Sequence, residues 1–249
     1  MGQPAVSIHN LGFRYPGTPE PCFQHLNLEI AAGDRFGLFG PNGAGKTTLM
    51  NCMTGLLSFK EGTIQLFGHD TGTSENAVKK LFGFVPQDFS FYHELSPAEN
   101  LAFFGAWSGL KKSAIKQRSE ELLEVLGLTG VFNKPVHKFS GGMKRKVNLA
   151  IGVIHQPKLL FLDEPTVGVD VQTRNVIIGY LKQLNSNGTT LIYTSHQLNE
   201  AEELCNTIAL IDEGKIIASN SLDNLLLEHK EDGLEGLFIN LTGKKYRDA

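Results

Sequence analysis

Alternation of apolar and polar residues predicts half-buried strands in several parts of the chain. Residues 5–15 (AVSIHNLGFRY) and 23–30 (FQHLNLEI) alternate in this way, as strands with one solvent-facing side do. Residues 62–68 and 206–219 show the same pattern, and the second of these contains a Glu-Gly pair, which is a hairpin signal. We expect the first three segments to form an antiparallel N-terminal β subdomain.

Two further segments are apolar throughout, namely residues 159–162 (LLFL) and 190–195 (TLIYTS). Continuous apolar strands separated by helices are typical of a parallel sheet that is covered on both faces. Helices are indicated by one-sided apolar spacing after residue 48 and by an amphipathic stretch over 111–126. The segment SPAEN (96–100) has the residues of a capping box, with proline at the first helical position.

These elements predict an α/β fold in one domain of approximate boundaries. Residues 1–87 and 156–219 form the α/β core with a mixed, mainly parallel sheet and the β subdomain. Residues 88–155 form an inserted helical subdomain, and 220–249 a short C-terminal tail. The chain has 249 residues, 41% of them hydrophobic, which is enough to bury a core of this size.

Composition excludes several other classes. The formal net charge of -3 does not suit a protein that coats nucleic acid. No apolar run approaches the roughly 20 residues of a membrane helix, and the first residues lack the pattern of a secretory signal. Cys22, Cys52 and Cys205 have no metal-site spacing, which favours reduced thiols. We therefore expect a soluble intracellular protein.

A glycine-rich segment, GPNGAGKTT (40–48), matches the pattern G-x-x-x-x-G-K-[ST]. Small residues let successive backbone N–H groups point at a phosphate, while Lys46 would reach the β- and γ-phosphates and Thr47 would ligate Mg²⁺. A predicted strand precedes the loop and a predicted helix follows it, so a P-loop that binds a nucleoside triphosphate is expected. The predicted phosphate contacts are Gly40, Pro41, Asn42, Gly43, Ala44, Gly45, Lys46, Thr47 and Thr48.

Two carboxylates, Asp163 and Glu164, follow the buried strand of LLFLDEP. Buried anions are costly unless a cation or protons are close by. A magnesium-bound triphosphate in the glycine loop would explain them, with Asp163 on Mg²⁺ and Glu164 accepting the proton of an attacking water. The alternative is that both residues cap the next helix.

A second anion-binding segment is predicted in KFSGGMKRK (138–146). Ser140 is a candidate N-cap, and Gly141 and Gly142 leave the start of the helix open. Because the first loop already holds the phosphates of one nucleotide, this segment suggests contact with a nucleotide on another subunit. Taken alone, the pattern fits ordinary helix capping equally well.

Over almost its whole length the chain resembles the ATP-binding-cassette (ABC) family. FSGGM (139–143) is similar to the family signature, VPQD to the Q-loop with Gln87, TVGVD to the D-loop with Asp170, and TSHQLNEAEELC to the switch region with His196. Tyr15 occupies the place of the aromatic residue that stacks on adenine. The resemblance implies that Gln87 contributes to the metal and catalytic site, that His196 contacts the γ-phosphate and that Asp170 lies at the nucleotide.

The resemblance also implies a mechanism. Two copies pair head to tail, each ATP lies between 40–48 of one chain and 140–142 of the other, and hydrolysis separates them. Lys46 and His196 would stabilise the developing charge. GGMKRK (141–146) is similar to the ATPases of ABC-2-type exporters. EPTVGVD (164–170) and the C-terminal LFINLTGKKYRD are similar to the drug- and sodium-export-like members of that group. Met143 replaces a glutamine common in the signature, and Val171 a usual proline.

Aromatic residues concentrate in 82–107, where an even spread would place about two. Eight fall there: Phe82, Phe84, Phe89, Phe91, Tyr92, Phe103, Phe104 and Trp107. About half are expected in the core of the helical subdomain. The others, with Phe91 and Tyr92 as the positions to test, are expected to form an apolar groove for a short cytoplasmic helix of a separate membrane permease.

The function expected from the resemblance is therefore an ATPase that powers an exporter and lies on the inner face of the cell membrane, held there by the permease. The alternative is a soluble ABC ATPase that acts on nucleic acid or the ribosome. Such proteins usually carry two cassettes, a long coiled coil, zinc-binding cysteines or basic extensions, and this sequence shows none of these. A regulatory ATP sensor would be expected to lack the base, Glu164.

Overall fold

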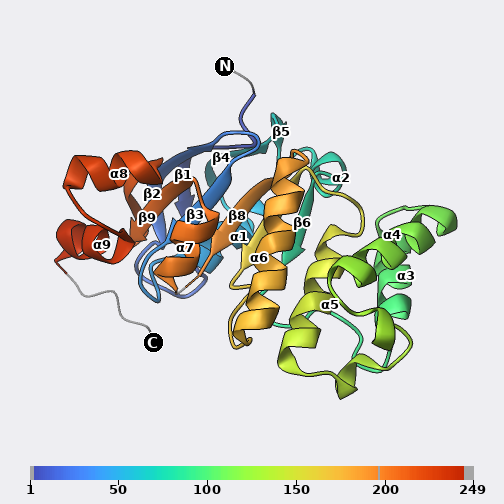
Figure 1. Cartoon of the computed structure of the whole chain (residues 1–249). Helices are drawn as coiled ribbons and strands as arrows, with labels where there is room; N and C mark the ends of the chain where they lie inside the picture. The colour runs from blue at the N-terminus through green and yellow to red at the C-terminus, as the bar shows by residue number, and fades with distance from the viewer. Residues whose placement is uncertain (1–2, 196, 244–249) are drawn as a thin grey trace.

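Two β-sheets form the framework of the molecule (Figure 1). The structure is a computed structural model and describes residues 3–195 and 197–243. The smaller sheet is antiparallel, with strand order β2-β1-β4-β5. Its strands are Val6–Phe13 (β1), Phe23–Ile30 (β2), Glu61–Leu66 (β4) and His69–Asp70 (β5). The antiparallel N-terminal β subdomain that alternation predicts is therefore confirmed.

The larger sheet has the strand order β10-β9-β3-β8-β7-β6. Its strands are Arg35–Phe39 (β3), Phe82–Val85 (β6), Leu159–Asp163 (β7), Thr190–Thr194 (β8), Thr207–Asp212 (β9) and Lys215–Ser221 (β10). All neighbours are parallel except the β9–β10 hairpin, which confirms a mixed, mainly parallel sheet. The sequence pattern does not predict β6, because its four residues, FGFV, are too few to show a clear period.

A hydrophobic core lies on each face of the larger sheet. Along β7, Leu160 and Leu162 belong to the core that contains buried residues of most of the helices, from Leu101 to Phe238. Leu159 and Phe161 belong to the core shared with the helix Lys46–Met53 (α1) and the antiparallel sheet. Because both faces of the strand are buried, its sequence is apolar at every position instead of alternating.

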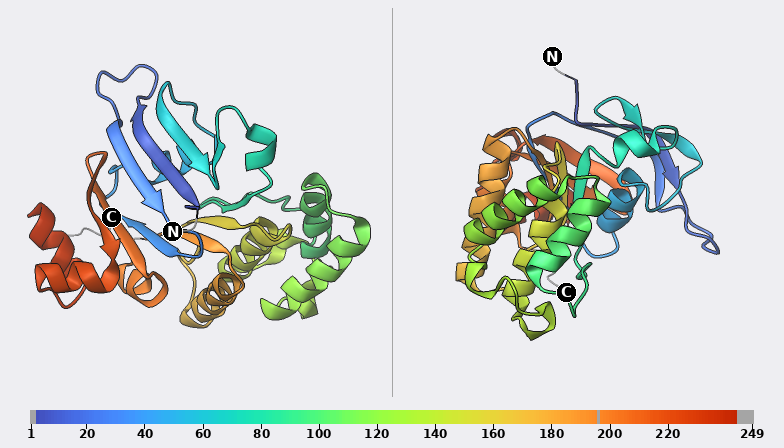
Figure 2. Two further views of the ribbon diagram at one scale, coloured as in Figure 1. Left: turned by 90° about the horizontal axis from the view of Figure 1, so that it is seen from above. Right: turned by 90° about the vertical axis from the view of Figure 1, so that its right-hand side faces the viewer.

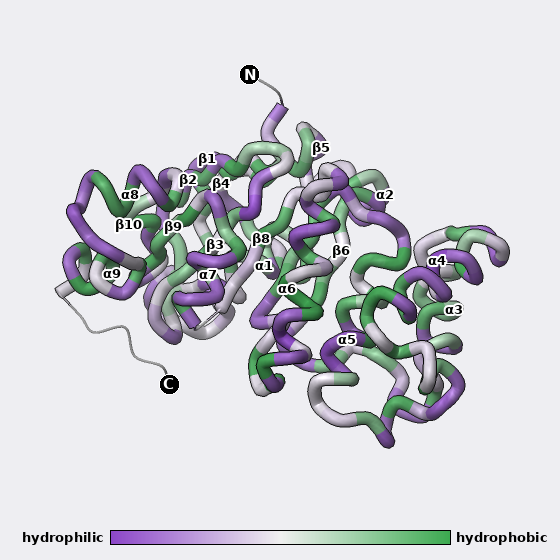
Figure 3. Tube along the Cα trace, in the orientation of Figure 1, coloured by the Kyte–Doolittle hydropathy of each residue, from purple (hydrophilic) through white to green (hydrophobic). Residues whose placement is uncertain are grey.

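The helices are Lys46–Met53 (α1), Glu75–Val78 (α2), Pro97–Trp107 (α3), Lys112–Val125 (α4), Gly141–Val153 (α5), Val171–Ser186 (α6), Leu198–Leu204 (α7), Leu222–His229 (α8) and Leu234–Thr242 (α9). Two short 3-10 turns cover Thr129–Val131 and Val136–Lys138. In Figure 3, hydrophobic and hydrophilic stretches alternate along α6, as expected for a helix with one face on the core. None of the helices in the described ranges is both long and apolar enough to span a bilayer.

Residues 88–155 are all described and contain helices and turns but no strand. They form the group α3, α4 and α5 at one end of the molecule, away from α8 and α9 at the other (Figure 2). The predicted capping box is present, because Ser96 caps α3 and exchanges hydrogen bonds with Glu99. The subdomain boundaries themselves stay predictions.

The C-terminal segment is more structured than the expected tail. Residues 222–242 contain α8 and α9. Leu225, Leu234, Leu237 and Phe238 are buried in the same core as α6 and α7. Single-sequence patterns missed this, since the apolar residues of such short helices acquire their partners only from distant segments.

Candidate functional site

The glycine loop connects β3 to α1 and occupies residues 40–45. Gly43 and Gly45 have positive φ angles of 79° and 108°. A side chain at Gly45 would also place its Cβ 2.7 Å from the ring of Phe23, so glycine is required there. The first turn of α1 carries no acidic residue, which leaves the positive end of the helix available to an anion.

Lys46 is the first residue of α1, and its side chain is buried against the loop. Its Nζ donates hydrogen bonds to the carbonyl oxygens of Gly40, at 2.7 Å, and Pro41, at 3.1 Å. Burial lowers the pKa of the ammonium, and the negative charges of Glu164 and Asp163 partly oppose this shift. The structure thus brings the lysine and both predicted carboxylates into one electrostatic site.

Asp163, at the end of β7, links the glycine loop to the centre of the larger sheet. Its Oδ2 accepts a hydrogen bond from the Thr47 hydroxyl at 3.2 Å, and its Oδ1 accepts one from Thr194 at 2.7 Å. A hydroxyl and a carboxylate brought together in this way are oxygen donors of the kind that Mg²⁺ prefers. The donor set therefore fits the predicted magnesium site at Thr47 and Asp163.

Glu164 is buried and has a left-handed backbone, with φ 51°. Its N–H points at Thr194, 3.2 Å from the carbonyl oxygen and 3.3 Å from the hydroxyl. A non-glycine residue in this conformation costs roughly 1–3 kcal/mol, and such residues cluster at functional sites. The helix-capping alternative for the two carboxylates is wrong, because α6 begins later and Asp170 is its N-cap.

The signature segment and the D-loop form a second group. Ser140 is exposed, and its hydroxyl caps α5 by accepting a hydrogen bond from the Met143 N–H at 3.3 Å. Gly141 is also exposed, whereas a Cβ at Gly142 would lie 2.9 Å from the hydroxyl of Thr173. Close packing between the starts of α5 and α6 therefore requires a residue without a side chain at 142.

Asp170 shares Thr173 with this group. The carboxylate of Asp170 accepts hydrogen bonds from the N–H and the hydroxyl of Thr173, both at 2.9 Å. These hydrogen bonds lower the pKa of Asp170. The N-cap of α6 and the start of α5 are thus positioned against each other through one threonine.

Tyr15 lies beside the glycine loop. Its hydroxyl is 2.9 Å from that of Thr48, and its ring packs edge-on against Phe13 with centroids 4.9 Å apart. The tyrosine is 40% exposed and lines an open cavity of about 860 Å³ that also includes Phe59 and Lys60. The position is compatible with stacking on a base, and the stacking role stays a prediction.

The remaining two predicted residues have different outcomes. Gln87 is exposed after the end of β6, and its backbone carbonyl accepts a hydrogen bond from Arg145 of α5. No contact of the Gln87 side chain with Thr47 or Asp163 is seen in the described part of the chain, so its role at the metal stays a prediction. His196 lies outside the described residues.

Sequence reading missed the side chains that attach α5 to the Q-loop. Arg145 is buried, and its guanidinium lies 4.8 Å from the centre of the Phe89 ring. Burial lowers its pKa, while the charges of Glu164 and Asp88 act in the opposite direction. Asn148, one turn later, donates to the carbonyl oxygen of Pro86 at 3.0 Å. Polar residues on the buried face of a helix were a signal, but the pattern did not show what they bind.

The aromatic cluster divides between core and surface. Phe91 is buried in the main core and stacks on Phe89, so the expectation that it lines a surface groove is wrong. Tyr92, Phe103 and Trp107 are 50%, 39% and 79% exposed. The ring of Phe103 lies between the other two, with its centroid 4.9 Å from that of Tyr92 and 6.2 Å from that of Trp107. These three residues are called the aromatic patch below.

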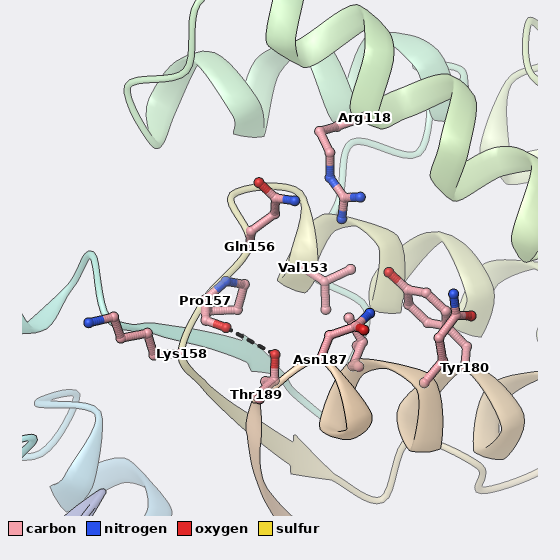
Figure 4. A pocket seen from close by; sticks show the side chains of 11 residues that line it. Arg118, Val153, Gln156, Pro157, Lys158, Tyr180, Asn187 and Thr189 are labelled. Carbon is pink, nitrogen blue, oxygen red and sulfur yellow. Dashed lines mark hydrogen bonds between the residues drawn. The ribbon is translucent and has the colours of Figure 1, made fainter. Parts of the chain in front are cut away.

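A separate cavity of about 280 Å³ lies between α4 and α6 (Figure 4). Arg118 reaches it from α4 and Tyr180 from α6, with Gln156 and Asn187 close by. None of the residues predicted to bind nucleotide lines this cavity. It is therefore distinct from the site described above.

Comparison with known proteins supports one family. A family model described as ABC transporter matches residues 23–167. The chain is 42% identical over 200 residues to the linearmycin resistance ATP-binding protein LnrL of Bacillus subtilis (strain 168). The matched region covers 80% of this chain and 64% of that protein. It is 35% identical to the daunorubicin resistance ATP-binding protein DrrA3 of Streptomyces coeruleorubidus, over 94% of this chain and 74% of that protein.

Two solved structures extend the comparison to the fold. The structure of an ATP-binding subunit of an ABC transporter has a TM-score of 0.88 at 24% identity. The aligned region covers 96% of this chain and 99% of that one. A dimeric ATP-binding cassette in a post-hydrolysis state with ADP and Pi has a TM-score of 0.79 at 25% identity, covering 87% and 98%. The predicted P-loop α/β fold is confirmed.

Proposed function

The chain belongs to the ABC transporter family, and from this premise we propose that it is the ATP-binding and ATP-hydrolysing subunit of a membrane exporter. The observation that carries the proposal is the contact between Thr47 and Asp163, with Lys46 and Glu164 beside it. These residues come from two distant motifs and form one site with the groups that phosphoryl transfer needs.

The side chains have distinct roles in this proposal. Lys46 and the loop amides bind the phosphates, and Glu164 accepts the proton of the attacking water. Thr47 and Asp163, completed by Gln87, would hold Mg²⁺, which supplies neutralisation of phosphate charge when it is bound. His196, outside the described residues, is proposed to contact the γ-phosphate.

A second copy of the chain completes the proposed site. Lys46, Asp163 and Glu164 are buried within their own subunit, whereas Ser140 and Gly141 are exposed at the start of α5. This difference supports a head-to-tail dimer in which 140–142 of one subunit contacts the nucleotide held by 40–48 of the other. The dimeric cassette bound to ADP and Pi is a precedent in a related protein.

Phosphate release from purified protein tests the enzymatic part. We expect ATP hydrolysis that requires Mg²⁺ and is abolished by EDTA, and an ATP-dependent increase in mass by light scattering. Absence of magnesium-dependent hydrolysis in the wild type, under conditions where the protein binds ATP, contradicts the proposed function.

The export role is proposed from relatives named for resistance to linearmycin and daunorubicin and for Nod factor export. In this proposal the chain works at the cytoplasmic side of a membrane, bound to a separate permease through the aromatic patch. Large exposed aromatic side chains in contact with one another are typical of protein interfaces. The same ATPase acting on nucleic acid or ribosomes remains the competing function.

Binding to permease-containing membranes distinguishes these functions. The double variant Tyr92→Asp, Phe103→Asp is expected to lose membrane binding and retain phosphate release. The control is Leu227→Asp, because Leu227 is 78% exposed but lies on α8 at the other end of the molecule. Normal membrane binding by the double variant places the permease site elsewhere, and binding to ribosomes or nucleic acid instead of membranes supports the competing function.

A further inference from the structure

Glu200, on α7, is a buried carboxylate that the proposed mechanism does not use. It is 2% exposed. Its Oε2 accepts hydrogen bonds from the hydroxyls of Thr166 at 2.5 Å, Tyr193 at 2.6 Å and Ser195 at 3.3 Å. Its Oε1 accepts one from Nε of Arg174 at 2.7 Å. A buried carboxylate with this many donors requires them all to be in place, since an unpaired buried charge is costly.

The partners of Glu200 come from three different segments. Thr166 lies in the turn after β7, and Arg174 lies in the first turn of α6. Tyr193 lies near the end of β8, and Ser195 directly follows that strand. Burial, and then the charge of Glu200, raise the pKa of Tyr193 well above its usual value, which keeps the phenol a donor. One carboxylate thus joins α6, α7 and the ends of two central strands (Figure 1).

Each segment also carries a residue of the nucleotide site. Thr166 follows Glu164 by two positions, and Thr194, next to Tyr193, binds both Asp163 and the Glu164 N–H. Arg174 follows the N-cap Asp170 by one helical turn, and its N–H donates to the Asp170 carbonyl at 2.9 Å. Glu200 thus contacts Thr166, which lies two positions from the proposed base Glu164, and Arg174, which lies one helical turn from Asp170.

We propose that Glu200 is a positioning residue that holds the turn bearing Glu164 and the start of α6 in a single arrangement. This inference rests on the proposed function. Because a shift of either segment would leave the buried carboxylate short of a donor, the two segments move together. A change at Asp170 on contact with the second subunit is thereby transmitted to the base.

The carboxylate partners of Arg174 supply a matched pair of variants. Arg174 binds the buried Glu200 through Nε and the half-exposed Glu203 through Nη2, both at 2.7 Å. Glu200→Gln is expected to lower kcat for phosphate release about tenfold, with the Kd of the monomer for ATP within twofold of wild type. Glu203→Gln is expected to leave both values within twofold, because its ion pair is exposed to solvent.

A dimerisation measurement tests whether Glu200 also affects the contact between the two subunits. In a Glu164→Gln background, where the ATP-bound dimer accumulates, adding Glu200→Gln is expected to raise the dimer dissociation constant several-fold, about as much as one charge-assisted hydrogen bond. All kinetics are measured well below the melting temperature of each variant. If Glu200→Gln lowers the melting temperature but keeps wild-type kcat and dimerisation, Glu200 contributes to stability alone, and the inference is overturned.

A second pair decides the matter if Glu200→Gln does not fold. Thr166→Val removes one hydroxyl at constant shape and is expected to lower kcat roughly threefold to tenfold. Thr166→Ser keeps the hydroxyl and is expected to keep most of the rate. Equal rates for the valine and serine variants contradict the inference. A wild type without ATPase activity refutes the proposed function instead, so the two failures are distinguishable.

Discussion

The starts of α1 and α5 are two glycine-bearing helix ends with different surroundings. Neither has an acidic residue in its first turn, so both present a positive dipole end. At α1 the N-cap is Gly45, which provides no side-chain cap, and Lys46 is buried within the loop. At α5 the N-cap is Ser140, which caps the helix itself and remains exposed.

This difference shows what each end requires. The start of α1 is supported by groups from across the fold, since Thr47 binds Asp163 and Tyr15 contacts Thr48. At the start of α5 the side chain of Ser140 supplies the N-cap, which contributes about 1 kcal/mol. A preassembled receptor and an exposed, self-capped helix end are complementary when two copies meet, which is the arrangement we propose.

Replacing the base gives the largest expected effect. Glu164→Gln removes the proton acceptor and leaves the start of α1 unchanged, so kcat for phosphate release should fall by about 10²–10⁴-fold with ATP binding retained. The dimer should accumulate with ATP, as measured by light scattering. Turnover at the wild-type rate would remove Glu164 from the mechanism.

Removing the lysine disables the α1 end selectively. Lys46→Ala should weaken ATP binding about 10- to 100-fold, because a charged hydrogen-bond donor to phosphate is lost. Fluorescence titration with an ATP analogue measures this. Lys215→Ala, at an exposed position on β10, is the control for a general charge effect, and an equal loss in both variants contradicts a specific role.

Adding a charge disables the α5 end selectively. Apart from its chain neighbours and the backbone of its own helix, no atom lies within 4 Å of a Cβ placed at Gly141, so Gly141→Glu should fold normally. It should bind ATP within twofold of wild type and weaken the ATP-bound dimer at least about tenfold, through repulsion from the phosphates. Normal dimerisation of this variant, seen by light scattering in the Glu164→Gln background, would show that 140–142 does not face the nucleotide.

The smallest effect concerns the aromatic residue beside α1. Tyr15→Ala should weaken ATP binding roughly fivefold to tenfold, since an aromatic stack contributes about 1 kcal/mol. Tyr15→Phe keeps the ring, loses the hydroxyl contact with Thr48 and should change the affinity less than twofold. If the phenylalanine variant loses as much as the alanine variant, the hydroxyl contact and not stacking is the important feature.

Local patterns predicted much of the fold. The antiparallel strands, the apolar strands β7 and β8, and the capping box of α3 all depend on residues close in sequence, and each is present. β6, α8 and α9 were not predicted. Their short apolar segments carry little periodicity, and their burial comes from β7 in the first case and from the core around α6 and α7 in the others.

The candidate site divides in the same way. The motifs indicated Lys46, Thr47, Asp163 and Glu164 by residue type and spacing, although the roles of these residues stay predictions. Phe91 was misplaced, because an aromatic residue has the same sequence pattern in a core as on a surface. The attachment of Arg145 to the Q-loop was missed, since it joins residues 58 positions apart.

The order of the amino acids alone therefore determined the family, the glycine loop and the chemical groups available to a nucleotide, because these depend on neighbouring residues. Tertiary structure decided which groups meet: Thr47 with Asp163, Gly142 with Thr173, and Glu200 with donors from three segments. Contacts of this kind arise from the packing of β7, β8 and α6 around one site. No local pattern encodes them, since each depends on where distant segments come to lie.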